Sequence, residues 1–184
     1  MAERLTVLLP GGAASPRCAQ VLEAALAGRR AEVLPRLEEP LHGRRLLFAV
    51  SLDESGVDHG VSDLLAFLRT HPGCLDGCVG GVLVDAPGDL YTKAAGRDLV
   101  LAASLAGCAF VGRPLVEGTG DLRNFTVQAR NAGCTLEEAY RLAAAELADR
   151  VLAFSRPRLQ RPKLLALHAS SRATSNTLAL WGLV

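Results

Sequence analysis

The chain has 184 residues, of which 49% are hydrophobic and 21% are charged, and its formal net charge is +1 at pH 7. These values are typical of one compact folded domain with room for an extension. The near-neutral charge and an aromatic content of 4% argue against a nucleic-acid-binding protein. No apolar run approaches the 18 residues of a membrane-spanning helix, and residues 1–5 lead directly into a strand-like run, so we expect neither a membrane span nor a secretory signal.

Apolar runs of strand length alternate along the chain with segments of helical periodicity. The first run, residues 5–9, is apolar almost throughout, as in a strand that is buried on both faces of a parallel sheet. Ser15 and Pro16 follow it, and this pair is typical of a helix start. The predicted strands are residues 5–9, 31–34, 45–51, 80–84 and 108–111, and the predicted helices are residues 15–28, 61–70, 89–106 and 135–154.

The last of these helices has the clearest signals. Thr135 and Glu138 have the spacing of a capping box. The apolar residues of one helical face then follow, namely Leu136, Tyr140, Leu147, Val151 and Phe154. The connection between the second and third strands has only a weak helical pattern. The alternation predicts an α/β domain of three layers, with a five-stranded parallel sheet between two layers of helices.

Residues 155–162 have the composition of a linker, because prolines bracket a run of basic and polar side chains. A phosphate-binding basic patch is the alternative interpretation. Beyond it a basic-led apolar strand, residues 163–168, and a small polar loop begin the pattern again. We therefore divide the chain into a domain of residues 1–154, a linker of residues 155–162 and an extra strand and helix start at residues 163–184. This last segment is either the start of a second domain or an element swapped between chains.

The loop after residue 168 has the chemistry of an anion site. Small residues allow the backbone to fold closely around a phosphate, and the free N–H groups of the following helix point outward. The candidate ligands to a phosphate are Ser170, Arg172, Ser175, Asn176 and Thr177. The spacing differs from that of an ATP-binding loop and from that of a dinucleotide-binding turn. A capped helix start is the alternative.

Residues 167–178 resemble the first strand and phosphate loop of the NADPH-dependent FMN reductase family, whose members open with Gly-Ser-x-Arg-x-x-Ser-x-Thr after an apolar strand. Ser170, Arg172, Ser175 and Thr177 stand at the motif positions, and Ala169 replaces the glycine. The resemblance implies a flavodoxin-like fold with strand order 2-1-3-4-5, FMN as cofactor, and NADPH or NADH as co-substrate. The flavin would then carry out the redox chemistry, and the protein would position it.

The body of the chain resembles the same fold in element order and carries a degenerate copy of the motif. Ser15 and Arg17 occupy motif positions, but the downstream hydroxyls are replaced. In the family the loops after the third and fourth strands hold the flavin ring. Here these are residues 52–60, whose acidic side chains would repel a reduced anionic flavin, and residues 85–91. Pro87, Gly88 and Tyr91 are the candidate ring contacts in the second loop, with Tyr91 able to stack, although both loops are also compatible with ordinary strand-to-helix turns.

Two other features of the sequence have a structural and a functional interpretation. Arg113 and Glu117, in residues 112–121, could orient a ligand or pin a glycine-rich loop by a salt bridge. His71, Cys74 and Cys78 could be imagined as a metal clip, although no second ligand pair with zinc spacing accompanies them, and a turn with ordinary reduced cysteines is favoured. The sequence shows no pattern typical of a Ser-His-Asp triad, and no side chain is a convincing acid, base or nucleophile.

These observations give two functional hypotheses. The first is an FMN-binding, NAD(P)H-dependent oxidoreductase, or a fragment of one. The second is a non-catalytic flavodoxin-like module that serves oligomerisation or regulation without bound flavin, and the degenerate first loop favours it. We further expect a cytoplasmic protein, because the five cysteines are odd in number and scattered, as reduced thiols are. The segment 163–184 is too apolar to stay in water, so it should pack on its own domain as an extra strand or on a neighbouring chain, and we expect a homo-oligomer. The apolar residues of this segment are Leu164, Leu165, Leu167, Leu178, Leu180, Trp181 and Leu183.

Overall fold

The computed structural model describes residues 4–155. The chain divides into two units, Met1–Phe154 and Ser155–Val184, and all but one of the described residues belong to the first unit. The linker and the extra segment that the sequence predicts lie outside the described residues. Within the first unit the strands are β1 (Leu5–Leu8), β2 (Ala31–Leu34), β3 (Arg45–Ser51), β4 (Val79–Asp85) and β5 (Ala109–Gly118). The helices are α1 (Pro16–Leu26), α2 (His59–Thr70), α3 (Thr92–Leu105), η1 (Arg123–Phe125), α4 (Thr126–Ala132) and α5 (Leu136–Ala153).

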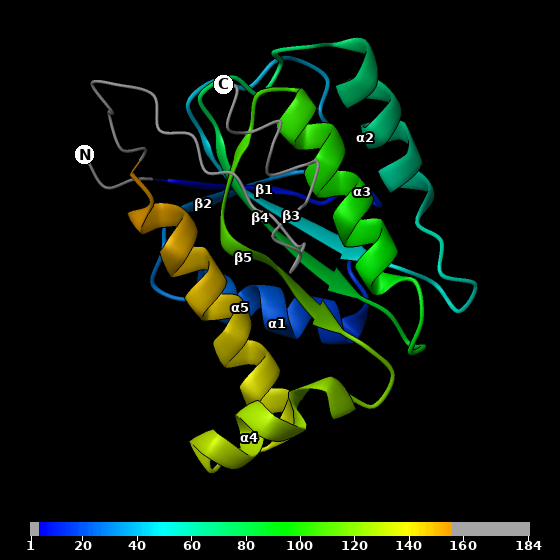
Figure 1. The fold of residues 1–184 in the computed structure, drawn as a ribbon, viewed down its shortest axis with the longest axis vertical. Helices are drawn as coiled ribbons and strands as arrows, with labels where there is room; N and C mark the ends of the chain where they lie inside the picture. The colour runs from blue at the N-terminus through cyan, green and yellow to red at the C-terminus, as the bar shows by residue number, and fades with distance from the viewer. Residues whose placement is uncertain (1–3, 156–184) are drawn as a thin grey trace, which may run out of the picture. The chain divides into compact units, whose positions relative to one another are not determined.

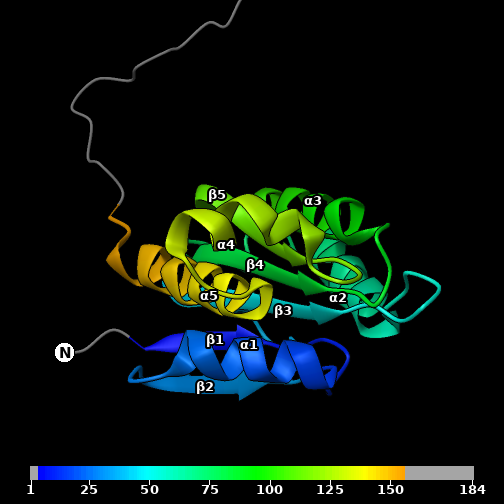
Figure 2. The same cartoon turned by 90° about the horizontal axis from the view of Figure 1, so that it is seen from below.

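The five strands form one parallel sheet in the order β2-β1-β3-β4-β5, which confirms the predicted sheet and strand order. Helices α1 and α5 cover one face, and α2 and α3 cover the other (Figure 1; Figure 2). Alternate strand residues point to opposite faces. Val7 and Leu47 therefore pack with α1 and α5, whereas Leu8 and Phe48 pack with α2 and α3. Burial on both faces explains why the strands have nearly continuous apolar sequences.

The connection from β2 to β3 has no helix. Parallel strands are usually joined by a crossover helix, but here residues 35–44 form a loop, in agreement with the weak pattern of the sequence. Leu37 and Leu41 of this loop are buried in the core on the α2 and α3 side. Two side chains thus occupy part of the space that a helix would fill on this face.

Strand β5 is much longer than predicted. It runs through Pro114 to Gly118 with a register shift against β4, and Arg113 has a φ of 54°. An edge strand tolerates proline and such a bulge, because one of its sides needs no ladder hydrogen bonds. The predicted loop at residues 112–121 is therefore mostly strand, and the predicted pairing of Arg113 with Glu117 is wrong. Glu117 instead accepts a hydrogen bond from Thr92 Oγ1 at 2.9 Å and lies 3.8 Å from Lys93 Nζ.

The capping box of α5 is present as predicted. Thr135 Oγ1 accepts from the Glu138 N–H at 3.2 Å, and the Glu138 carboxylate accepts from the Thr135 N–H at 2.8 Å. The short elements η1 and α4 were not predicted, because they span too few residues to show a period. Over residues 4–155, no helix is both long enough and apolar enough to span a bilayer.

The cysteines of the imagined metal clip have other contacts. Cys74 is buried in the core, and the Cys78 thiol donates to the Leu41 carbonyl at 3.2 Å. In the part of the chain that the structure describes, no three histidine, cysteine, aspartate or glutamate side chains group as metal ligands.

Candidate functional site

The carboxyl ends of the parallel strands meet at one edge of the sheet, where ligands bind in folds of this class. The chain turns from β1 to β2 on one side and from β3 toward β5 on the other, so the strand order reverses between β1 and β3. The loops after β3 and β4 project beyond this edge (Figure 1; Figure 2). The site is built from these loops, the loop after β1 and the start of α1.

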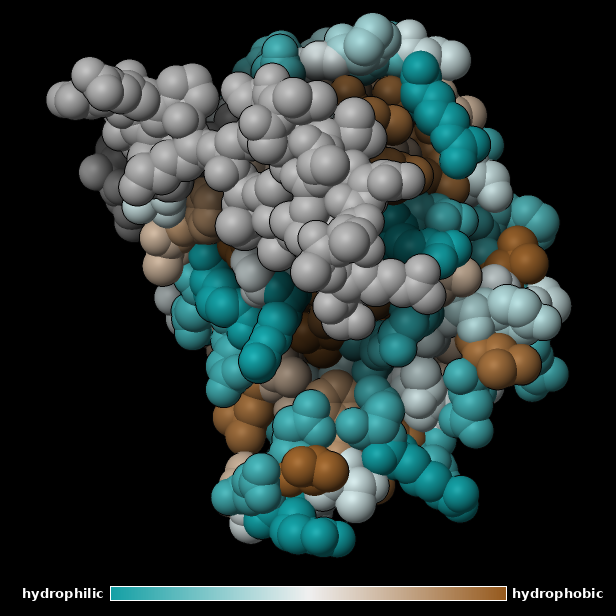
Figure 3. Space-filling view, in the orientation of Figure 1, coloured by the Kyte–Doolittle hydropathy of each residue, from teal (hydrophilic) through white to brown (hydrophobic). Residues whose placement is uncertain are grey.

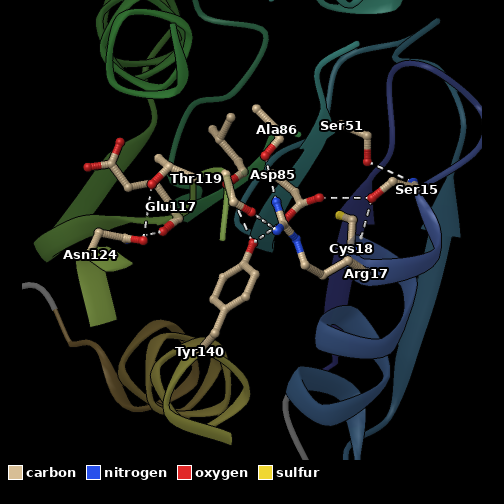
Figure 4. Close-up of polar contacts among 12 residues, drawn as sticks. Ser15, Arg17, Cys18, Ser51, Asp85, Ala86, Glu117, Thr119, Asn124 and Tyr140 are labelled. Carbon is tan, nitrogen blue, oxygen red and sulfur yellow. Dashed lines mark hydrogen bonds and ion pairs between the residues drawn. The ribbon is translucent and has the colours of Figure 1, made fainter. Parts of the chain in front are cut away.

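A buried carboxylate, Asp85, organises the centre of this edge (Figure 4). Asp85 is the last residue of β4, and its side chain is 4% exposed. Ser15 Oγ donates to Asp85 Oδ2 at 2.9 Å, and Arg17 Nε donates to Asp85 Oδ1 at 2.8 Å. The Tyr140 hydroxyl of α5 lies 3.3 Å from the same Oδ1. One carboxylate thereby joins β4 to the start of α1 and to α5.

The Arg17 guanidinium makes three hydrogen bonds within the domain. Besides Asp85, it donates through Nη1 to the Gly120 carbonyl and through Nη2 to the Ala86 carbonyl. Asn124 fixes the loop that carries Gly120, because its side chain donates to the Glu117 carbonyl at 2.7 Å and accepts from Thr119. Arg17 thus ties α1 to the ends of β4 and β5, and each of its three nitrogens already has an acceptor in the protein.

Ser15 is engaged in the same way. Its N–H donates to Ser51 Oγ at the end of β3 at 2.9 Å, and its Oγ accepts from the Cys18 N–H at 3.0 Å as the cap of α1. The phosphate-binding interpretation of Ser15 requires donors that point to a ligand, whereas these donors point to Asp85 and Ser51. The interpretation of Ser15 and Arg17 as phosphate ligands stays a prediction, and their contacts in the structure are to the protein itself.

Burial controls the remaining ionisable groups of this network. Burial, with the negative charge of Asp85 second, raises the pKa of the Tyr140 hydroxyl far above its ordinary value. Burial also raises the pKa of the Cys18 thiol to about 11. Both groups are protonated at neutral pH, so neither is an activated nucleophile or base. Gly118 makes the packing possible, because a Cβ there would lie 2.5 Å from the Tyr140 ring and 2.6 Å from Asp85 Oδ1.

A second carboxylate lies beside the loop after β1. Asp58 caps α2 by accepting from the N–H groups of Gly60 and Val61 at 2.9 and 3.3 Å. A Cβ at Gly11 would lie 3.1 Å from Asp58 Oδ2, so this charge borders the loop. Asp58 therefore places a carboxylate beside this loop and disfavours an anion there, whereas the charge of Asp85 is compensated by Arg17.

The loops after β3 and β4 meet through Tyr91. Asp53 folds the first loop, because its Oδ1 accepts from Ser55 N–H, Ser55 Oγ and Val57 N–H, and these bonds lower its pKa. Gly56, at the tip of this turn, has a φ of 80°, and a Cβ there would lie 2.2 Å from the Tyr91 ring. Tyr91 itself has a φ of 74° and precedes α3. Its ring therefore lies against the backbone of the neighbouring loop.

These two loops present apolar surface to solvent. Tyr91 is 57% exposed, Leu90 is 66% exposed and Val57 is 41% exposed. Figure 3 shows isolated hydrophobic patches within a hydrophilic surface on the side where the loops project. An exposed aromatic ring with aliphatic neighbours is suited to the face of a planar ligand.

The structure brings five of the predicted site residues to one edge and leaves the others outside its described range. Ser15 and Arg17 lie at the start of α1, whereas Pro87, Gly88 and Tyr91 lie in the loop before α3. The Gly88 carbonyl accepts from the Gly120 N–H at 3.0 Å. The residues outside the described range are Ser170, Arg172, Ser175, Asn176 and Thr177.

Sequence reasoning missed Asp85, Ser51 and Tyr140 as members of one network. Asp85 and Ser51 are the polar residues that end two buried strands, and this position was the available signal. Tyr140 was correctly predicted on the buried face of its helix, but no pattern could pair it with a carboxylate 55 residues away.

No protein-family model matches the chain, and no curated protein matches it in sequence. Among solved structures, the chain is similar to the flavodoxin of Streptococcus pneumoniae TIGR4, with 12% identity, a TM-score of 0.50, and coverage of 80% of this chain and 97% of the flavodoxin. It is also similar to RosB with its bound intermediate 8-demethyl-8-formylriboflavin-5'-phosphate, with 10% identity, a TM-score of 0.54, and coverage of 95% and 99%. The fold is flavodoxin-like.

Proposed function

We propose that this chain is a flavin-binding protein of the oxidoreductase class, which holds a flavin ring on the loops after β3 and β4. The observation that carries the proposal is the contact of Tyr91 with Gly56, which brings the two loops together at the carboxyl edge of the sheet, where Tyr91, Leu90 and Val57 are exposed. The flavodoxin-like fold supports it, since a pneumococcal flavodoxin and RosB share the architecture. A bound flavin would supply hydride and electron transfer, with NADPH or NADH as the proposed co-substrate.

The residues of the body fit the ring better than they fit the phosphate of FMN. Ser15 and Arg17 donate to Asp85 within the protein, and Asp58 places negative charge beside the loop after β1. We therefore propose that ring stacking provides most of the affinity in this domain. The loop that contains Ser170, Arg172, Ser175, Asn176 and Thr177 remains a proposed phosphate-binding loop of the chain.

Titration of the purified chain with riboflavin and FMN, followed by quenching of flavin fluorescence, tests this proposal. We expect Arg17→Met to leave the ratio of the two dissociation constants unchanged, because the phosphate gains little from the body of the chain. Tyr91→Ala should weaken both about five- to tenfold, since aromatic stacking contributes about 1 kcal/mol, and Tyr91→Phe should retain binding. Leu142→Ala, a change at an exposed leucine of α5, is the matched control and should have no effect.

Two results would contradict parts of this proposal. The absence of any quenching at high flavin concentration would refute flavin binding. A preference of more than a hundredfold for FMN, lost in Arg17→Met but not in Arg172→Gln, would show that Arg17 binds phosphate after all. Loss of the preference in Arg172→Gln alone would assign the phosphate to the 170–177 loop.

A second candidate function is a non-catalytic module for oligomerisation or regulation. The specific observation in its favour is the Asp85 network, which uses Ser15 and Arg17 for internal contacts. This candidate predicts a colourless protein that does not bind flavin but has a defined oligomeric mass. Absorbance at flavin wavelengths, with the mass in solution measured on the same sample, separates the two candidates.

A further inference from the structure

A cavity of about 620 Å³ lies at the carboxyl ends of β1 and β2, on the side of the sheet that α2 covers. Its volume is within the range of small-molecule sites. Leu8, Leu34, Leu64 and Phe67 form apolar walls, and Pro10 and Gly11 of the loop after β1 close one end. None of its lining residues belongs to the loop that carries Tyr91, and its His59 and Gly60 directly follow the loop after β3.

The missing helix between β2 and β3 explains why this cavity exists. In parallel α/β folds a crossover helix would cover the sheet here. Residues 35–44 replace it with a loop, of which only Leu37 and Leu41 pack into the core. The floor of the cavity is fixed by close packing of α2 on the loop after β1, since a Cβ at Gly60 would lie 1.9 Å from the Pro10 carbonyl oxygen.

The polar side chains around the cavity include both hydrogen-bond donors and carboxylates. Arg36, two residues beyond β2, and His59, at the start of α2, supply hydrogen-bond donors. Glu38 and Asp63 supply carboxylates. Within residues 4–155, Arg36, Glu38 and Asp63 have no hydrogen-bond or ion-pair partner of their own. A ligand that contacts both the apolar walls and these groups needs a flat apolar part, hydroxyl donors and an anionic part.

We propose that this cavity binds the adenosine monophosphate moiety of a nucleotide. The purine would lie against Leu64 and Phe67, the ribose hydroxyls would donate to Asp63 or Glu38, and the phosphate would accept from Arg36. In dinucleotide-binding α/β folds one acidic residue accepts a hydrogen bond from the ribose of the nucleotide. Glu38, four residues beyond β2, and Asp63 of α2 could accept in this way here. Arginine suits phosphate because its planar donors match two phosphate oxygens.

Isothermal titration of the full chain with AMP tests the proposal, with adenosine, inorganic phosphate and NAD⁺ titrated alongside. We expect AMP to bind and inorganic phosphate alone to bind at least tenfold more weakly. Arg36→Gln should weaken AMP about tenfold and leave adenosine unchanged, since the lost contact is to the phosphate. Asp63→Asn combined with Glu38→Gln should weaken AMP and adenosine equally. Arg36, Glu38 and Asp63 are exposed, so these changes do not threaten folding.

Arg69→Gln is the matched control, because Arg69 is an exposed arginine of α2, the helix that lines the cavity, but is not itself a lining residue. It should leave AMP binding unchanged, and an effect equal to that of Arg36→Gln would reduce the result to surface charge and overturn the proposal. The proposal would also be overturned if millimolar AMP gave no heat of binding, or if inorganic phosphate bound as tightly as AMP. NAD⁺ bound more tightly than AMP would identify the nucleotide as half of a dinucleotide. Because flavin quenching uses Tyr91 and not Arg36, each proposal can fail without the other.

Discussion

Replacement of Arg17 by methionine separates a structural from a ligand-binding role of this residue. Methionine retains an unbranched aliphatic chain in place of the aliphatic part of arginine. It lacks the guanidinium that contacts buried Asp85 and the carbonyls of Ala86 and Gly120. Removal of one partner from a buried ion pair costs about 3–5 kcal/mol, because the remaining charge loses its compensation. The Arg17 side chain is 28% exposed, so we expect the lower end, about 3 kcal/mol. For a chain of this size the Tm should then fall by about 6–12 °C.

Urea unfolding followed by circular dichroism measures this cost, and Arg123→Met is the matched control. Arg123 forms an ion pair of the same 2.8 Å length with Asp121, but those side chains are 85% and 58% exposed. An exposed pair contributes at most about 1 kcal/mol. The two variants therefore compare ion pairs of equal length at two degrees of burial. Equal losses in the free energy of unfolding would refute the argument that burial makes the Arg17 pair costly to break.

A double-mutant cycle adds a second check. Asp85→Asn in the Arg17→Met background removes the uncompensated charge, so the double variant should be more stable than the sum of the two single changes allows, by at least about 1 kcal/mol. Additive losses would mean that the two side chains do not depend on each other. The same variant also bears on function, because a structural Arg17 predicts that the ratio of FMN to riboflavin affinity is unchanged in Arg17→Met.

Three further predictions concern packing, pH and helix capping. Gly60→Ala should destabilise the domain by about 1–3 kcal/mol in urea unfolding, because the new methyl group would overlap the Pro10 carbonyl. Ser62→Ala, on the exposed side of α2, is the control and should not change the free energy of unfolding. Equal stability of the two variants would contradict the close contact at Gly60. Burial raises the pKa of Cys18 from 9.0 to about 11, so the folded state retains a proton that the unfolded chain loses. The free energy of unfolding should therefore fall by about 2 kcal/mol from pH 9 to 11, and an unchanged slope in Cys18→Ala would show another origin. Thr135→Ala should cost about 1 kcal/mol through loss of the cap of α5, and an unchanged urea midpoint would argue against it.

The sequence predicted most of the sheet because its strands are buried on both faces. The segments 31–34 and 45–51 were predicted with the bounds that the structure has, and the capping box at Thr135 located the start of α5. The prediction ended β5 too early at Gly112 and Pro114, because local propensity disfavours both residues in a strand. Pairing with β4 on one side carries the edge strand through them to Gly118.

The candidate site shows the same division. Periodicity, capping and polar residues at strand ends depend on neighbours in the chain, so the sequence by itself determined the flavodoxin-like order of elements and the edge where Ser15, Arg17 and Tyr91 lie. Whether Arg17 faces a ligand or a buried carboxylate depends on Asp85, 68 residues further along the chain. The contact of Tyr91 with Gly56 and the cavity left by a missing helix likewise depend on segments that only folding brings together. Tertiary structure decided these points, because hydrogen bonds and packing act on distances in space and not along the chain.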